Sequence, residues 1–195
     1  MNREEMLEKI KQAMPEKRFQ HTLGVEKTAI LYAEIYGEST EKASIAALLH
    51  DYAKYYPDDQ AEKLIRSEKM DPRLLEYSHA LWHAPVGAYL AKQEFGVTDA
   101  EILEAIRVHT TGSAKMNKLD KILFLADYTE PGRDFPGVEE ARAYSKTSLD
   151  AGMLFALRRT IAYISSKEHP IFPDTFESYN AFAFLKQEGD VKRFE

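Results

Sequence analysis

The sequence predicts an all-α protein in which one domain is built as a bundle of helices. Apolar residues recur at helical spacing along nearly the whole chain. Alternation of apolar and polar residues at every second position is scarce, and the Asn-Gly and Asp-Gly pairs that favour hairpin turns are absent. The chain has 195 residues and no internal repeat, so we expect residues 1–195 to form a single domain with a sizeable core.

The first two expected helices meet at a proline. Asn2 can cap a short helix, whose apolar stripe consists of Met6, Leu7, Ile10 and Met14. Pro15 marks the turn that follows it. A longer helix then runs to about Tyr36, with an apolar stripe that includes Phe19, Leu23, Ile30 and Ala33. Gly37 follows at a position where a left-handed residue commonly ends a helix.

The third expected helix is the most apolar part of the chain. Ser39 can cap it, and residues 43–49 are apolar on nearly all sides, which indicates a helix buried by its neighbours. It ends in the pair His50-Asp51. A polar helix from residue 57 to about residue 69 follows, and Asp71-Pro72 opens another short helix.

Three further helix signals lie between residues 84 and 127. Ala84-Pro85 restarts the chain into a helix that ends at Gly96. Thr98 can cap the next helix, which runs to about His109 and is broken by residues 111–113. Asn117 can cap a helix that continues through Asp127.

The remaining segment combines a loop, a long helix, a connector and a last helix. The loop at residues 130–137 is rich in Pro, Gly and Asp and is typical of a functional loop. Ser148 precedes an amphipathic helix that runs to about Lys167. Residues 169–173 form an extended connector, and Asp174 can cap the last helix.

Composition excludes several classes of protein. Apolar residues make up 44% and charged residues 30%, which excludes a disordered or collagen-like chain. Cysteine is absent, so disulfides, thiolate zinc sites and a cysteine nucleophile are excluded. Neither a signal peptide nor an apolar run of membrane-spanning length is visible, so we expect a soluble cytoplasmic protein without membrane partners. The net charge of −6 argues against nucleic-acid binding and means that an anionic substrate needs local positive charge.

Histidines and carboxylates carry the chemistry that the sequence indicates. Five of the six histidines fall near an expected helix end or beside a Pro or Gly, where side chains from several helices can converge. His50-Asp51 ends the most apolar helix, and Asp127 follows a second apolar run, so both helices deliver an acid to the rim of the core. An unpaired buried carboxylate is costly, which favours a metal or an arginine partner. Imidazole and carboxylate ligands suit Fe, Mn, Co or Zn.

Structural interpretations of the same residues stay open at this point. A single histidine in a helix is often a structural side chain. The partners that Asp127 can have instead of a metal are Arg107, Lys118 and Lys121. His79 and His83 are four residues apart, but Pro85 disfavours helical geometry at the residue before it, so we interpret His79 as structural.

Taken together, the set resembles the H…HD…H…H…D signature of the HD-domain metal phosphohydrolases. It is formed here by His21, His50-Asp51, His83, His109 and Asp127. The surrounding segments are similar to those of the bacterial YqeK family, the HD-type symmetrical dinucleoside tetraphosphatases: HTLGV at 21–25, LLHDYAK at 48–54, WHAPVGA at 82–88, VHTTG at 108–112, LADYTEPGR at 125–133 and HPIFPDTFESYN at 169–180. The resemblance covers about residues 17–185. It implies an HD-type helical bundle with a metal site where helix ends converge.

The resemblance also implies a divalent metal cofactor, iron with Mn or Co as substitutes, present as one or two ions. The principal ion would be held by His21, His50, Asp51 and Asp127. A second ion could be held by Asp51, His83 and His109. If only one ion binds, His83 and His109 would instead face the phosphates as hydrogen-bond donors or proton carriers. The implied catalytic residues are Asp51, Lys54, His83, His109 and Arg133.

The implied reaction cleaves diadenosine tetraphosphate, or another dinucleoside polyphosphate, at its centre into two nucleoside diphosphates such as ADP or GDP. A metal ion lowers the pKa of bound water and neutralises phosphate charge. Lys54 adds an ammonium beside the phosphates, and Arg133 adds a bidentate fork for a phosphate oxygen. The implied substrate-binding residues are Gly24, Lys54, His83, His109, Thr110, Arg133, Pro170, Ile171, Phe172, Pro173, Asp174 and Thr175. A homodimer is compatible with this assignment.

Two other functions remain alternatives. The same metal site could serve another nucleotide phosphohydrolase, such as a phosphomonoesterase or a hydrolase of a guanosine alarmone or cyclic dinucleotide. The chain could also be a helical HD scaffold that binds a nucleotide or a protein without catalysis. Such a scaffold would be expected to lack some of the ligands, and all of them are present here.

Overall fold

The computed structural model describes residues 3–188, and within them it has helices and no strand. This confirms the all-α prediction; the predicted cap at Asn2 lies outside the described residues. The elements are α1 (Arg3–Ala13), α2 (Glu16–Tyr36), α3 (Thr40–Leu49), α4 (Asp58–Ser67), the short 3₁₀ helices η1 (Pro72–Glu76) and η2 (His79–Leu81), α5 (His83–Phe95), α6 (Ala100–Val108), α7 (Lys118–Thr129), α8 (Val138–Thr147), α9 (Leu149–Ser166) and α10 (Pro173–Glu188).

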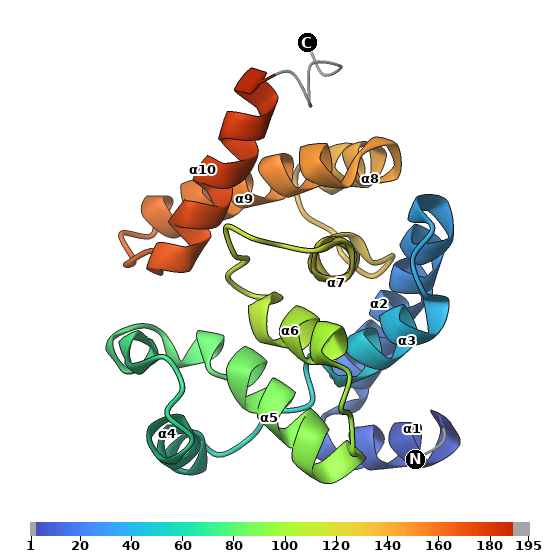
Figure 1. The fold of residues 1–195 in the computed structure, drawn as a ribbon, viewed down its shortest axis with the longest axis vertical. Helices are drawn as coiled ribbons and strands as arrows, with labels where there is room; N and C mark the ends of the chain where they lie inside the picture. Colours follow the sequence, from blue (N-terminus) through green and yellow to red (C-terminus); the bar gives the residue numbers. More distant parts are fainter. Residues whose placement is uncertain (1–2, 189–195) are drawn as a thin grey trace.

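Helix α7 lies at the centre of the bundle, and α3 packs beside it. Figure 1 shows α7 nearly end-on, with α2 and α3 on one side, α5 and α6 below it and α8 to α10 above it. Helix α7 packs against α2, α3, α6, α8 and α9. Leu123 and Leu125 of α7 and Leu49 of α3 are fully buried, as expected for helices that are apolar on nearly all sides. The carboxyl ends of these two helices carry Asp51 and Asp127.

A second, smaller core lies between α4, η1, η2 and α5. Its buried members are Ala53, Ala61, Ile65, Leu74, Trp82, Val86, Leu90 and Phe172. The indole nitrogen of Trp82 donates a 2.7 Å hydrogen bond to the carbonyl of Leu74, so the polar edge of this buried ring is satisfied. Phe172 belongs to the connector before α10, so this small core fixes the connector beside α5 and η1.

Most helix boundaries match the sequence signals. Gly37 adopts the left-handed conformation after α2. Ser39, Asn117 and Ser148 cap α3, α7 and α9 through their side chains. At Asn117 a full capping box forms, because the side chain of Asp120 accepts from the backbone of Asn117 in return.

The starts of three helices differ from the prediction, and one further helix was not predicted. The cap of α6 is Asp99, not Thr98, because the Asp99 carboxylate accepts from the backbone nitrogens of residues 101 and 102. Helix α5 begins at His83 rather than at Ala84-Pro85, because Pro85 falls in the first turn, where its missing N–H is tolerated. Helix α10 begins at Pro173, so Asp174 lies inside its first turn. Helix α8 follows Gly137 directly and was not predicted.

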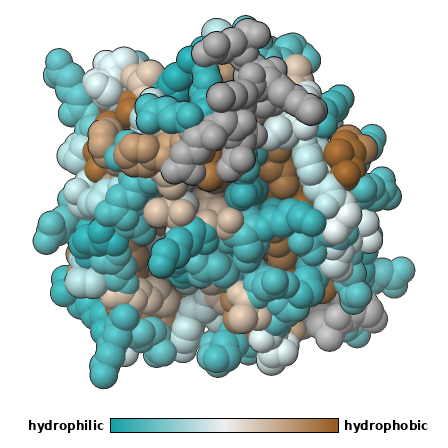
Figure 2. Space-filling view, turned by 45° about the horizontal axis from the view of Figure 1, so that its top comes forward, coloured by the Kyte–Doolittle hydropathy of each residue, from teal (hydrophilic) through white to brown (hydrophobic). Residues whose placement is uncertain are grey.

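On the face in Figure 2, hydrophilic residues predominate and the hydrophobic ones lie in small separate groups. None of the helices in residues 3–188 is long and apolar enough to cross a bilayer.

Candidate functional site

Six residues of the predicted signature meet at one place in the bundle. His50 is the C-cap residue of α3 and Asp51 follows it, and His109 is the C-cap residue of α6. His83 is the first residue of α5, and Asp127 lies in the last turn of α7. His21 differs from the expectation of helix ends and breaks, because it lies in the second turn of α2.

The side chains of these residues lie close enough to share ligands. Nε2 of His21 is 3.0 Å from Oδ1 of Asp127, and Nε2 of His50 is 3.2 Å from Oδ2 of Asp51. The other oxygen of Asp51, Oδ1, is 3.1 Å from Nε2 of His83. Asp51 therefore lies between two groups of histidines and presents one oxygen to each.

Two overlapping groups of potential metal ligands result from this arrangement. His21, His50 and Asp127 form one group, and His50, Asp51 and His109 form the other, with the ligand atoms of each group within 4.8 Å of one another. The Nε2 atoms of His21 and His50 are buried and have no hydrogen-bond partner among the described residues. Unpaired buried nitrogens beside carboxylate oxygens fit a divalent cation, and the N/O donor set suits Fe, Mn, Co or Zn.

The other ring nitrogen of each histidine is held by an oxygen. Nδ1 of His50, His83 and His109 lies 2.6–2.8 Å from a backbone carbonyl three residues earlier. Nδ1 of His21 lies 3.0 Å from Oε1 of Glu130. Donation from Nδ1 to these oxygens leaves the Nε2 lone pairs directed at the centre of the cluster.

The electrostatics match a pair of ionised acids among histidines. Burial would raise the pKa of Asp51, but the neighbouring His50 and His83 outweigh it and hold this pKa well below its ordinary value. The pKa of Asp127 is lowered in the same way by its neighbouring histidines and an arginine. Burial, then the neighbouring His83 and His50, lower the pKa of His109 to about 3, so this imidazole is neutral at neutral pH.

Three cationic side chains surround the acids. Nζ of Lys54 lies 3.3 Å from Nδ1 of His83, and burial lowers the pKa of this ammonium. Arg133 donates to the Oδ1 atom of Asp127 at 2.5 Å and to its carbonyl at 2.8 Å. Arg18 donates to Oδ2 of Asp51 at 2.9 Å. Lys54 and Arg133 were predicted near the site, whereas Arg18 was not.

The partner of Asp127 is thus Arg133 rather than one of the three cations considered from the sequence. Those residues have other partners: Arg107 pairs with Glu104, Lys121 pairs with Asp150, and Lys118 donates to the carbonyl of Tyr36. His79 lies outside the cluster. It is stacked on Trp82 and its ring nitrogen lies 2.9 Å from Asp58, which agrees with its interpretation as structural.

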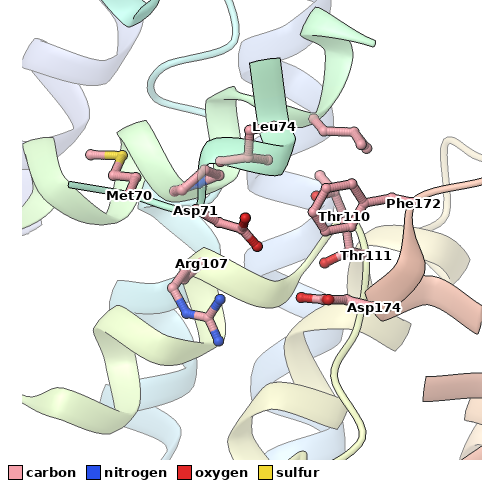
Figure 3. Close-up of a pocket in the computed structure, with 10 residues that line it drawn as sticks. Met70, Asp71, Leu74, Arg107, Thr110, Thr111, Phe172 and Asp174 are labelled. Carbon is pink, nitrogen blue, oxygen red and sulfur yellow. The ribbon is translucent and has the colours of Figure 1, made fainter. Parts of the chain in front are cut away.

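A cavity of about 150 Å³ has Thr110 and Thr111, the two residues that follow His109, in its lining, whereas none of the six cluster residues lines it. It is lined by Met70, Asp71, Leu74, Leu81, Pro85, Arg107, Thr110, Thr111, Phe172 and Asp174. In Figure 3 the carboxylates of Asp71 and Asp174 and the guanidinium of Arg107 surround a common space. The hydroxyl oxygen of Thr110 is buried and has no hydrogen-bond partner among the described residues.

The cavity includes only part of the predicted substrate-binding set. Thr110, Phe172 and Asp174 line it, whereas Pro170, Ile171, Pro173 and Thr175 are not among the lining residues. Gly24 lies against Glu130, because a Cβ added there would be 2.5 Å from Oε2 of Glu130. The sequence interpretation missed the roles of Glu130 and Arg18. The only sequence signal for Glu130 was the presence of Gly24 and Gly132, which lie against its carboxylate, in the motifs HTLGV and LADYTEPGR.

Comparisons with known proteins agree with this site. The HD domain family model matches residues 18–132, which contain every histidine and aspartate of the cluster. The chain is 48% identical, over 92% of its length and 97% of the relative, to the symmetrical bis(5'-nucleosyl)-tetraphosphatase of Bacillus subtilis. It is 46% identical to the protein of the same name from Halalkalibacterium halodurans, over 92% of this chain and 96% of the relative.

A solved structure shows the same architecture. The predicted HD superfamily hydrolase from Clostridium acetobutylicum, described as involved in NAD metabolism, superposes with a TM-score of 0.91 at 35% identity, over 94% of this chain and 98% of that one. HD domain hydrolases bind divalent metals, and the cluster described above could hold one. The chain belongs to the HD domain family and, within it, to the family of the symmetrical bis(5'-nucleosyl)-tetraphosphatases.

Proposed function

We propose that this protein hydrolyses diadenosine tetraphosphate and related dinucleoside polyphosphates symmetrically into two nucleoside diphosphates. The observation that carries the proposal is the cluster of four histidines and two aspartates, in which the buried Nε2 atoms of His21 and His50 are unpaired among the described residues. The names of the relatives add the reaction and the substrate class. A single HD-type domain with its core at about residues 17–185 and a cytoplasmic location belong to the same proposal.

The proposed ligands of the principal ion are His21, His50, Asp51 and Asp127. Iron is the proposed metal, and Mn or Co should substitute for it because the donor set is the same. When bound, the ion supplies Lewis acidity, which activates a water molecule and neutralises phosphate charge.

A second ion at Asp51, His83 and His109 is the better of the two alternatives for these histidines. Their Nε2 atoms lie 3.1 Å apart, and both Nδ1 atoms are held by carbonyls. Two neutral imidazoles so oriented direct two lone pairs at each other, and a shared cation or proton relieves the repulsion. The lowered pKa values of His83 and His109 oppose protonation, which favours the cation.

In this proposal the cationic side chains bind the phosphates of one half of the substrate, and the cavity binds its nucleoside. Lys54 and Arg133 bind the phosphates of the bound half, and Arg18 lies on the same side of Asp51 as His50. The nucleoside of that half occupies the cavity, where the unpaired Thr110 hydroxyl and the Phe172 ring offer a polar and an apolar contact. ADP or GDP is then the expected product. A homodimer is compatible with this proposal, as it is with the sequence.

The test is a product analysis of Fe(II)-, Mn(II)- and Co(II)-loaded protein with diadenosine tetraphosphate. We expect ADP as the main product in at least one loaded form, resolved by chromatography. Release of orthophosphate from nucleoside monophosphates, without cleavage of the dinucleotide, would instead support a phosphomonoesterase. Nucleotide binding without any product would support a non-catalytic scaffold.

Arg133→Ala is expected to weaken the interaction with phosphate while metal content stays at that of the parent protein. The lost contact is charge-assisted and contributes about 1.5–3 kcal/mol, so kcat/KM should fall about 10–100-fold. Steady-state kinetics and elemental analysis of the same samples check this. Loss of metal in this variant would mean that Arg133 acts by positioning Asp127, with which it is paired here.

A further inference from the structure

We infer that Glu130 is the positioning residue that holds His21 as a metal ligand, and that Gly24 and Gly132 provide the space for its carboxylate. The inference rests on the proposed metal site. It assigns a role to a buried acid that lies outside the H…HD…H…H…D signature, and it gives Gly24 a role different from substrate contact.

The need for Glu130 follows from where His21 lies. His50 and His109 cap helices, and His83 follows a 3₁₀ helix, so each finds a carbonyl at a helix end for its Nδ1. His21 lies in the second turn of α2, where the neighbouring carbonyls already accept bonds within the helix. An acceptor from another element must therefore fix its ring, and Oε1 of Glu130 lies 3.0 Å from its Nδ1.

The surroundings of Glu130 hold its carboxylate in one place. The residue is 4% exposed, and its Oε2 atom accepts a 2.5 Å hydrogen bond from the backbone N–H of Gly132. A Cβ at Gly24 would lie 2.5 Å from Oε2, and a Cβ at Gly132 would lie 3.0 Å from both carboxylate oxygens. Glycine at these two positions thus admits the carboxylate between α2 and the end of α7.

The backbone of the same segment is also fixed. Arg142 of α8 donates to the carbonyls of Thr129, Glu130 and Arg133 at 2.9–3.0 Å. The last turn of α7 and the stretch that follows it therefore place both the ligand Asp127 and the carboxylate that orients His21. A carboxylate on Nδ1 fixes the tautomer, directs Nε2 toward Asp127 and makes the imidazole a stronger ligand.

The experiment measures Co(II) affinity by competition with a chromogenic chelator, together with the visible absorption spectrum of the bound Co(II). Glu130→Ala should weaken Co(II) binding about 10–100-fold and change the spectrum, as is usual when the partner of a ligating histidine is lost. Glu130→Gln should lie between Glu130→Ala and the parent protein, because the amide keeps the shape and one acceptor but not the charge. The matched control is Glu26→Gln. Glu26 is a buried glutamate of α2 whose carboxylate pairs with Arg3, and its substitution should leave the Co(II) affinity and the spectrum unchanged.

A second variant keeps the test independent of any folding defect in Glu130→Ala. Gly24→Ala should weaken Co(II) binding in the parent protein by displacing the carboxylate, but should have little further effect in the Glu130→Ala background. Unchanged affinity and spectrum in Glu130→Ala and Gly24→Ala, or a parent protein that binds no Co(II), would overturn the inference. Because Co(II) binding is measured without substrate, a Glu130-dependent site in a protein that does not cleave the dinucleotide would refute only the proposed function. Cleavage with unaltered Co(II) binding in Glu130→Ala would refute only this inference.

Discussion

Asp51→Ala is expected to abolish metal binding and hydrolysis while leaving the helical content of the protein close to that of the parent. Asp51 presents Oδ2 to His50 at 3.2 Å and Oδ1 to His83 at 3.1 Å, so its loss removes a ligand from both groups. Metal-assisted stabilisation is worth several kcal/mol in the transition state, which corresponds to about 10³-fold or more in kcat. Activity, elemental analysis and far-UV circular dichroism of the purified variant check the three parts.

The control for Asp51→Ala is Asp59→Ala. Asp59 lies in the first turn of α4 with its side chain 73% exposed, and its ion-pair contact with Lys63 is a long 3.9 Å. We expect parental activity and metal content from it. An Asp51→Ala protein that retains a full equivalent of metal would contradict the assignment of Asp51 as a ligand.

Removal of the metal with a chelator is expected to abolish activity and lower the melting temperature without unfolding the protein. The cluster then keeps the buried carboxylate of Asp51 and the half-buried carboxylate of Asp127 without the cation that the ligand geometry fits. Mn(II) added back at about 100 times its Kd should stabilise the fold by about 2.7 kcal/mol, or about 5–10 °C for a chain of this size. A melting curve that does not respond to Mn(II), Fe(II) or Co(II) would mean that the cluster holds no metal.

Sequence patterns predicted the helices that carry a continuous apolar run or stripe. Helix α8 has weak patterning, because its buried residues are Val138, Ala141 and Ser145, two of which are small. Its packing against α9 therefore decides its conformation. The cap of α6 was misassigned because Thr98 and Asp99 are adjacent and both suit the position. Only the three-dimensional path of the chain decides which side chain reaches the first free backbone nitrogens.

The predicted signature residues lie together because most of them are at helix ends that converge on one place in the bundle. Glu130 and Arg18, which contact these residues from distant positions in the chain, are not marked by any comparable sequence pattern. Glu130 is a single acid in a loop, and its contact with His21 spans 109 positions. Arg18 lies three residues before His21, but nothing in the sequence indicates that it reaches Asp51 from α2.

Hydrolysis of diadenosine tetraphosphate in oxygen-18 water tests the central claim most directly. If the cluster activates water against an inner phosphorus while the nucleoside of one half occupies the cavity, the products are two ADP molecules. Mass spectrometry should then find one oxygen-18 per turnover, at the terminal phosphorus of one ADP, and Asp51→Ala should form none. AMP and ATP as the main products would contradict symmetric cleavage, even in a protein whose metal ligands are those assigned here.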